Sequence, residues 1–228
     1  MNQDSSQKPC VPIRTGLSLR GWVWWYMMEL PCYLWVSVCY RYRSWGSMRV
    51  PKRGPVLIVA NHQSFLDPVV LGVSGHRRPF HAMARDTLFH NPVFGWLIRS
   101  LRAIPIDQEA SDLRAMRACI GVLKRGEVLL IFPEGSRTED GSTAPFAPGT
   151  MVLIKRARPM VVPVAIEGAH HAWPRGQTLP RATGRIMAMY GRPICADKLM
   201  AMGAERALAH LRDQIEGMRL RLKARGQA

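Results

Sequence analysis

Residues 56–67 read Val56-Leu-Ile-Val-Ala-Asn-His-Gln-Ser-Phe-Leu-Asp67, and the architecture of the chain can be worked out from this segment. Its first five residues form a continuous apolar run, which is typical of a strand buried on both faces. A short, mostly polar stretch follows at once, and Pro68 favours the start of a helix because its fixed φ suits the first helical position. A strand, a loop and a helix in this order predict an α/β domain.

The same alternation of apolar runs and helical patterns continues along the chain. Further strands are predicted at 103–106, 128–132, 161–166 and 185–190, and helices at 68–72, 92–101, 112–125, 150–157 and from Asp197 onward. Near the C-terminus, apolar side chains recur every three or four residues and predict a helix that covers the sheet; they are Leu208, Leu211, Ile215, Met218 and Leu222. We therefore expect an α/β fold whose central, mostly parallel or mixed sheet is flanked by helices.

The segment 22–40, WVWWYMMELPCYLWVSVCY, is apolar and aromatic, with one charge at Glu29 and a proline at Pro31. A signal peptide is disfavoured because no small-residue cleavage site follows it. Three structures stay open: one membrane-spanning helix, two short helices broken near Pro31 in the membrane interface, and a hairpin on a soluble core. Trp and Tyr prefer the headgroup region and flanking arginines favour anionic lipid, so we expect the membrane-associated helical hairpin. Residues 1–50 would then form a flexible basic arm and this hairpin, and residues 51–228 the α/β domain.

Charge and cysteine content restrict the partners. The chain has 32 Lys and Arg against 16 Asp and Glu, a formal net charge of +16, which favours an anionic partner over a plain solvated surface. The sequence has no helix-turn-helix, zinc-finger or base-stacking motif, so we expect a membrane or a phosphorylated substrate and no nucleic acid. The five cysteines are irregularly spaced and form no Cys/His cluster, which predicts neither a disulfide framework nor a metal site.

His62 and Asp67 are the first candidate pair for chemistry. His62 directly follows the predicted strand 56–60, and ligands of open α/β sheets gather at such carboxyl ends of strands. In a continuous helix the five-residue spacing would point the two side chains apart. Asp67 precedes Pro68, however, so it is expected to cap the helix while residues 61–66 form a loop that folds His62 back onto it. The carboxylate would then fix the tautomer of the ring. The alternatives are a plain helix cap and a histidine satisfied in a turn.

A second polar cluster follows the strand 128–132. Arg137 can bind a phosphate through two parallel hydrogen bonds, and Gly135 lets the backbone approach a ligand closely. A polar turn with a surface pair between Glu134 and Arg137 is the alternative. Arg85 lies in a predicted basic loop, where an ordinary surface position is favoured over a functional one. Ser64 lacks the Gly-x-Ser-x-Gly turn of a hydrolase nucleophile.

Over roughly residues 50–195 the chain resembles the 1-acylglycerol-3-phosphate acyltransferases of the glycerolipid acyltransferase superfamily. The resemblance rests on Asn-His-x-Ser-x-x-Asp at 61–67 and Phe-Pro-Glu-Gly-Ser-Arg at 132–137. It extends to the proline-containing apolar strand 161–166 and to the segments 83–89 and 94–96. The two motifs in this order are specific for the family.

The resemblance implies a role for each motif residue. His62 would take the proton from a glycerol hydroxyl, which attacks an acyl thioester directly, and Asp67 would orient His62. Binding of the acceptor's glycerol phosphate is expected of Arg85, Glu134, Gly135 and Arg137, and supporting roles of Asn61, Ser64, Pro133 and Ser136. The acceptor would be lysophosphatidate and the donor acyl-CoA or acyl carrier protein, with no cofactor. The site of action would be an anionic membrane surface on the cytoplasmic face.

Two positions depart from the family pattern. Gln108 stands where an arginine that contacts phosphate is expected, and Phe146-Ala-Pro-Gly149 lacks a lysine beside its glycine. Either Arg85, Arg102 and Arg137 suffice for the phosphate, or the acceptor is another lysolipid. A membrane-lipid-binding module without catalytic activity is a further alternative.

Overall fold

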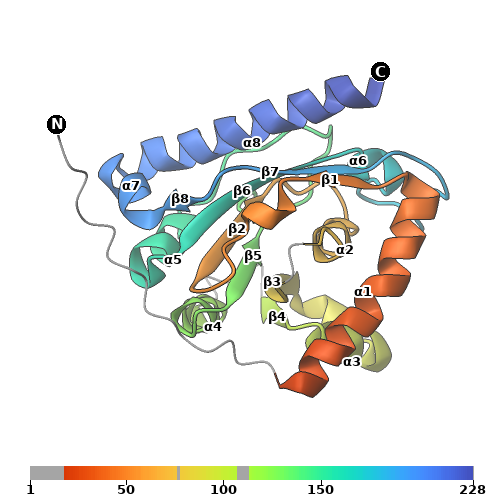
Figure 1. Cartoon of the computed structure of the whole chain (residues 1–228), viewed down its shortest axis with the longest axis horizontal. Helices are drawn as coiled ribbons and strands as arrows, with labels where there is room; N and C mark the ends of the chain where they lie inside the picture. The colour runs from red at the N-terminus through yellow and green to blue at the C-terminus, as the bar shows by residue number, and fades with distance from the viewer. Residues whose placement is uncertain (1–17, 76–77, 107–112, 228) are drawn as a thin grey trace.

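The structure is a computed structural model that describes residues 18–75, 78–106 and 113–227, with the side chain of Gln227 excepted. Residues 1–17 of the predicted N-terminal arm and Gln108 lie outside the described residues. Strands and helices alternate along the chain and form three layers, a sheet between two sets of helices (Figure 1). The expected α/β class is therefore confirmed.

The described strands form one sheet in the order β1-β7-β6-β2-β5-β3-β4, with β8 paired to β6. Their bounds are β1 Arg43–Trp45, β2 Val56–Ala60, β3 Phe80–Arg85, β4 Ala103–Ile106, β5 Val128–Ile131, β6 Met160–Glu167, β7 Met187–Tyr190 and β8 Ile194–Cys195. The central strand β2 is parallel to both neighbours, since Val56 lies opposite Val128 of β5 and Met160 of β6. β7 and β8 run antiparallel to β6, so the sheet is mixed, as expected.

Helices cover both faces of the sheet. One core joins the sheet to α4 Leu113–Lys124, α5 Gly149–Ala157, α7 Ala196–Ala201 and α8 Ala204–Gln227. The other core joins it to α1 Leu19–Tyr40, α2 Asp67–Gly72 and α6 Ala169–Ala172, while α3 Pro92–Ser100 packs beside β4. Along β2 the side chains alternate between these cores, with Ile58 on the α2 side and Leu57 on the α8 side. The predicted apolar stripe of α8 covers the sheet, and Leu211 and Ile215 in it are fully buried.

Strand β3 occupies residues that the sequence predicted as a basic loop. It pairs with β4 and β5 in parallel, and its side chains alternate between buried and partly buried positions before Arg85 is exposed. His81 and Arg85 interrupt its apolar character, so it lacks the continuous apolar run of the central strands. The short helical turns η1 Ser47–Arg49 and η2 Asp86–Phe89 complete the described elements.

The N-terminal helix is the main departure from the expectation. α1 is one continuous helix of 22 residues, so the predicted hairpin broken near Pro31 is wrong. A proline inside a helix costs about 3 kcal/mol because it removes a hydrogen bond and crowds the preceding turn. Both halves of α1 pack on the domain, since Trp25 meets the ring of Phe80 edge-on and Val36 and Tyr40 are buried, and these contacts offset that cost. Within the described ranges, no helix has the length and apolar character that crossing a membrane needs.

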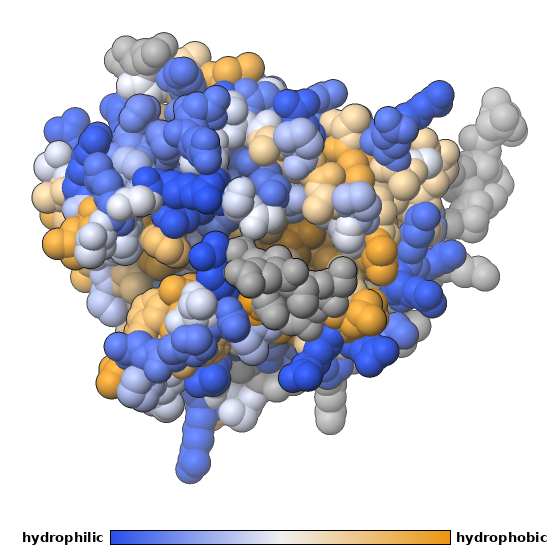
Figure 2. Space-filling model, turned by 180° about the vertical axis from the view of Figure 1, so that it is seen from behind, coloured by the Kyte–Doolittle hydropathy of each residue, from blue (hydrophilic) through white to orange (hydrophobic). Residues whose placement is uncertain are grey.

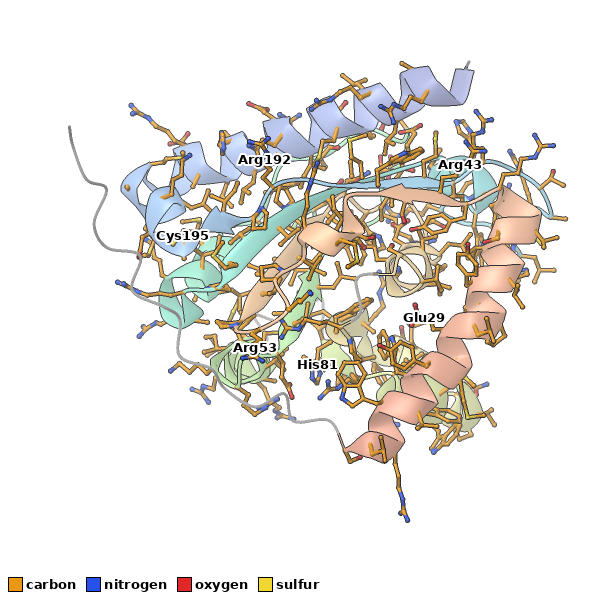
Figure 3. The ribbon with its side chains drawn as sticks, viewed as in Figure 1. Glu29, Arg43, Arg53, His81, Arg192 and Cys195 are labelled. Atoms are coloured by element: carbon orange, nitrogen blue, oxygen red, sulfur yellow. The ribbon has the colours of Figure 1, made fainter. Side chains whose placement is uncertain are left out.

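α1 has an inner and an outer face, and the residues of each face recur every three or four positions along the helix. Residues of the inner face are at least partly buried: Trp25, Glu29, Cys32, Val36 and Tyr40. The outer face is 51–80% exposed and entirely apolar: Val23, Met27, Leu30, Leu34 and Val38. Glu29 lies on the side of α1 that faces α2 (Figure 3), and burial raises the pKa of its carboxyl group. The single acidic residue of α1 is therefore turned away from the apolar face.

Candidate active site

The candidate site lies where the parallel strands β2, β5 and β6 end. Asn61, the first residue after β2, is fully buried and fixes the start of the loop 61–66. Its amide nitrogen donates to the carbonyl of Ile166 at 2.9 Å, and its amide oxygen accepts from the Ile166 N–H at 2.8 Å. The asparagine side chain thus ties the loop to β6 with two hydrogen bonds, and its supporting role in the reaction stays a prediction.

One carboxylate oxygen of Asp67 contacts three successive residues of the loop 61–66. Oδ2 of Asp67 is 2.8 Å from Nδ1 of His62, and it accepts from the N–H groups of Gln63 at 2.6 Å and Ser64 at 2.8 Å. The loop therefore folds back as predicted, and the pairing of His62 with Asp67 is confirmed. The predicted cap position is off by one residue, because Leu66 caps α2 and Asp67 is its first residue. The carboxylate accepts hydrogen bonds from the loop and not from the first turn of α2, because the N–H groups of Gln63 and Ser64 point toward it.

The imidazole of His62 is held in one orientation. Its ring stacks on Phe132, with ring centroids 4.1 Å apart and an angle of 15° between the planes. Because the Asp67 carboxylate can only accept, the neutral form of the ring carries its hydrogen on Nδ1 and a free electron pair on Nε2. The side chain is 20% exposed, and Nε2 receives no hydrogen bond from the residues that the structure describes. This nitrogen is therefore able to act as a base toward a bound molecule.

Glu134 connects the His62 loop to the segment after β5. Its Oε1 accepts from the N–H of His62 at 2.8 Å, and its Oε2 accepts from the N–H of Ala144 at 3.0 Å. The N–H of Thr138 completes the link by donating to the carbonyl of His62 at 2.8 Å. Burial raises the pKa of Glu134, and the two backbone hydrogen bonds oppose that shift. Both oxygens of Glu134 contact the protein, so its part in acceptor binding stays a prediction.

Arg137 is the strongest candidate for binding an anion. Its guanidinium lies over the ring of Phe65, 3.6 Å from the centroid, and its buried Nη1 lacks a hydrogen-bond partner in the described part of the chain. Burial lowers the pKa of Arg137, and the positive charges of Arg175 and Arg85 lower it further. The structure thus brings Arg85, which ends β3, close enough to Arg137 to contribute to the lowering of its pKa. Arg175 was not predicted, because only the fold brings the turn after α6 to this place.

Ser64 makes two hydrogen bonds to backbone groups, and its supporting role in the reaction stays a prediction. It is fully buried, its hydroxyl donates to the carbonyl of Trp173 at 3.1 Å, and the same oxygen accepts from the N–H of Leu66 at 3.3 Å. In the second motif, Pro133 is buried, whereas Gly135 and Ser136 are exposed on the turn after β5. Their predicted roles stay predictions.

A buried polar network, which sequence reasoning missed, links the loop to α8. The Gln63 amide donates to the carbonyl of Gly141 at 3.0 Å and lies 3.4 Å from the carboxylate of Glu167. Arg219 of α8 binds the same carboxylate at 2.9 Å and also pairs with Glu216 at 2.6 Å. No sequence signal marks Gln63, since it occupies a variable position of the motif.

Arg102 lies apart from Arg85, Arg137 and Arg175. It pairs with Glu127 at 3.1 Å, and His81 pairs with the same carboxylate at 2.9 Å. Arg102 and Glu127 precede β4 and β5, so they lie at the amino ends of parallel strands, opposite the His62 loop. The suggestion that Arg102 replaces a missing phosphate contact is therefore wrong.

A family model described as "Acyltransferase" matches residues 41–167 of this chain. The chain belongs to the acyltransferase family, as its two motifs predicted. Similar proteins bear a more specific name. A 1-acyl-sn-glycerol-3-phosphate acyltransferase of Pseudomonas aeruginosa is 30% identical over 179 residues, which cover 77% of this chain and 66% of that protein.

Two further comparisons agree with this family. The chloroplastic 1-acyl-sn-glycerol-3-phosphate acyltransferase BAT2 of Brassica napus is 28% identical over 172 residues, or 72% of this chain and 49% of that protein. The chain thus spans about half the length of such curated relatives. The crystal structure of the 1-acyl-sn-glycerophosphate (LPA) acyltransferase PlsC from Thermotoga maritima has the same fold, with a TM-score of 0.76 over 89% of this chain and 80% of that chain at 24% identity.

Proposed function

We propose that this protein transfers a fatty acyl group from a thioester to the free hydroxyl of 1-acylglycerol-3-phosphate. The observation that carries the proposal is the fixed imidazole of His62, whose Nδ1 is bound to Asp67 and whose Nε2 is open. Nε2 takes the hydroxyl proton while the oxygen attacks the thioester carbonyl. The C–S bond then breaks, and the imidazolium returns its proton to the leaving thiolate. A positioned base of this kind contributes about 10²–10⁴-fold to the rate.

The arginines around the loop support a phosphorylated acceptor. Arg137 offers an unpaired and partly buried guanidinium, and its neighbours Arg85 and Arg175 add positive charge that a phosphate dianion relieves. The names of the relatives support lysophosphatidate as this acceptor. Donor and acceptor would be bound together, which makes the attack effectively unimolecular. The donor is acyl-CoA or acyl carrier protein, both of which are anionic and suited to a chain of net charge +16.

We further propose that the outer face of α1 lies in the interface of an anionic membrane, on its cytoplasmic side. Its five apolar side chains are exposed, and Trp24 of α1 contacts Trp96 of α3 at 5.7 Å between ring centroids. Val93 and Trp96 extend the apolar surface, being 76% and 60% exposed. Apolar side chains also stand among hydrophilic ones on the face seen in Figure 2. Such a surface would bring the active site to its lipid acceptor.

His62→Ala tests the mechanism. Acyl transfer from acyl-CoA and from acyl carrier protein to a panel of lysolipids is measured by lipid mass spectrometry. We expect the variant to lose about 10²–10⁴-fold in kcat, because the base is gone. His210→Ala on α8 is the matched control and should keep full activity. Unchanged turnover in His62→Ala would overturn the mechanism.

The same panel separates the alternatives. Transfer to another lysolipid with none to lysophosphatidate would replace the acceptor and keep the chemistry. No transfer by the native protein with any donor or acceptor, together with intact vesicle binding, would favour a lipid-binding module without catalytic activity.

A further inference from the structure

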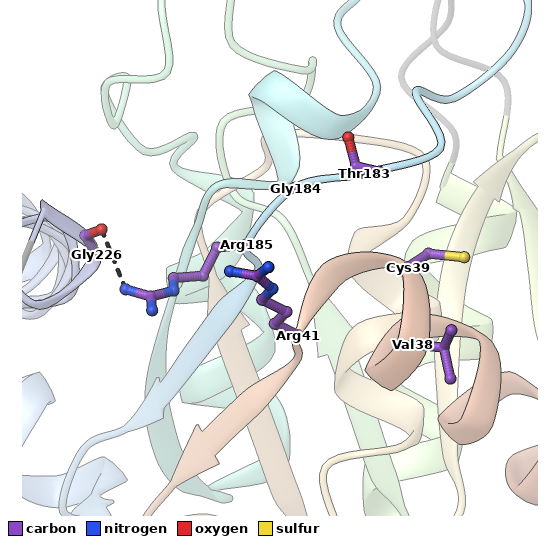
Figure 4. Close-up of a pocket in the computed structure, with 7 residues that line it drawn as sticks. All are labelled: Val38, Cys39, Arg41, Thr183, Gly184, Arg185 and Gly226. Atoms are coloured by element: carbon purple, nitrogen blue, oxygen red, sulfur yellow. Dashed lines mark hydrogen bonds between the residues drawn. The ribbon is translucent and has the colours of Figure 1, made fainter.

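A cavity outside the candidate active site lies where the ends of α1 and α8 meet the segment before β7. It has a volume of about 600 Å³ and is lined by Val38, Cys39, Arg41, Thr183, Gly184, Arg185 and Gly226 (Figure 4). Two arginines line it, and none of its lining residues in the described part of the chain carries a carboxylate side chain. Because two guanidinium groups in one cavity repel each other, an anion bound between them would be stabilised by both.

Arg41 stands in a backbone conformation that favours glycine. It caps the C-terminus of α1 with φ 46° and ψ 42°, in the left-handed region where a Cβ atom crowds the following carbonyl. Its side chain is exposed, and within the described ranges it makes no ion pair or hydrogen bond that explains an arginine here. The guanidinium therefore keeps its hydrogen-bond donors available to a ligand.

Arg185 is held in place by the end of α8. Its Nη1 donates to the carbonyls of Arg225 at 3.2 Å and Gly226 at 3.1 Å. These carbonyls belong to the last turn of α8, which carries partial negative charge. One of the three guanidinium nitrogens makes these bonds, and among the described residues no hydrogen bond involves the other two. In Figure 4 the guanidinium of Arg41 lies beside the Arg185 side chain.

The cavity continues the apolar face of α1 and shares an edge of the sheet with the active site. Val38, which is 80% exposed, is both a lining residue and the last member of that face. β7 begins beside the end of β6, since Met187 pairs with Glu167, so Arg185 and the His62 loop lie at the same edge. An anionic head between two arginines and an apolar tail along a helix is the chemistry of a phospholipid.

We propose that this cavity binds the headgroup phosphate of an anionic phospholipid, whose acyl chain lies along α1 from Val38. The inference rests on the proposed membrane contact of α1 and is independent of the acyl-transfer chemistry at His62. Through the bound lipid, the end of α1 and the carboxyl edge of the sheet face the same membrane surface. The site thus accounts for part of the preference for anionic lipid that a net charge of +16 predicts.

Arg41→Gly is a sharp test, because glycine suits the left-handed backbone and the variant should fold at least as stably as the native chain. Arg158→Gly is the matched control. Arg158 also caps a helix in the left-handed region, with φ 46° and ψ 51° at the end of α5, and its loss removes the same charge. Binding of the full chain to phosphatidylcholine vesicles, with and without phosphatidic acid, is measured by co-sedimentation.

We expect Arg41→Gly to weaken binding to the phosphatidic acid vesicles about tenfold, and Arg158→Gly to leave it nearly unchanged. Equal weakening in both variants would show a general charge effect and overturn the site. A second outcome would also overturn the site. If inorganic phosphate raises the Tm of the native chain, and Arg41→Gly abolishes this rise without changing vesicle binding, the ligand is a soluble anion. Acyl transfer measured in neutral detergent reports on His62 separately, so failure of the proposed function leaves the vesicle result interpretable.

Discussion

The substitution Asp67→Asn separates the charge of the carboxylate from its geometry. The N–H groups of Gln63 and Ser64 can only donate, so they hold the amide oxygen of the new side chain where Oδ2 stands. The NH₂ group then takes the place of Oδ1, which has no hydrogen-bond partner among the described residues. Nδ1 of His62 still donates to an oxygen, so its tautomer is preserved and only the charge is lost.

The size of the loss follows from this arrangement. Hydrogen bonds to charged groups contribute about 1.5–3 kcal/mol and neutral ones about 0.5–1.5 kcal/mol, so the bond to His62 weakens by about 1–1.5 kcal/mol. That corresponds to a loss of about tenfold in kcat. In Asp67→Ala, by contrast, two buried N–H groups lose their acceptor and His62 loses its orientation. We expect that variant to lose most of the contribution of a positioned base, about 10²–10⁴-fold.

The assay is steady-state acyl transfer to lysophosphatidate with both variants, alongside thermal unfolding to establish that each is folded. If Asp67→Asn is as inactive as Asp67→Ala while both unfold like the native chain, the shared oxygen does not control the tautomer. If Asp67→Asn keeps full activity, the charge of Asp67 does not contribute to the reaction.

Two further substitutions test charged groups at the two ends of the sheet. Burial, and after it the charge of Arg102, lowers the pKa of His81 below its ordinary value of 6.5, while Glu127 opposes this shift. The contribution of His81 to the free energy of unfolding is therefore present above pH 6.5. It is lost as the pH falls through the lower pKa of the folded state. His81→Gln should therefore flatten the acid decline of Tm below pH 6.5, and thermal unfolding across pH with an unchanged slope would contradict this assignment. Arg219→Met leaves Glu167 buried without its cation and should lower the free energy of unfolding by about 3–5 kcal/mol in urea titrations. A loss below about 1 kcal/mol, the usual contribution of an exposed pair, would show that the pair is solvated.

The sequence predicted the central strands of the sheet, which are almost entirely buried. The segments 56–60, 128–131 and 160–167 are strands buried on both faces, and their continuous apolar runs indicate this directly. β3 is half-buried, and its His81 and Arg85 resemble a basic loop until the partner strands are known. For α1, local chemistry at Pro31 predicted a break, whereas packing on Phe80 and α2 keeps the helix continuous.

The site was predictable where local geometry defines it. Pro68 and the five-residue spacing led to the expectation that His62 folds back onto Asp67, beside the alternatives of a plain helix cap and a histidine satisfied in a turn, and the structure shows this contact. The neighbours that come from distant parts of the chain were not predictable. Arg175 and Arg219 are far from the loop in sequence, and only the fold brings them near it. Arg102 precedes β4, so it lies at the amino end of that strand, where it pairs with Glu127.

The loop after β2 uses its own backbone to hold the histidine. The N–H groups of residues 62, 63 and 64 all donate to carboxylates, the first to Glu134 and the other two to Asp67. None of the three is then left to stabilise the oxyanion that develops on the thioester carbonyl during attack. The same bonds should make these amides exchange slowly with solvent, although they belong to a loop. In the proposed mechanism, the donors that stabilise this oxyanion must therefore come from a segment other than residues 62–64.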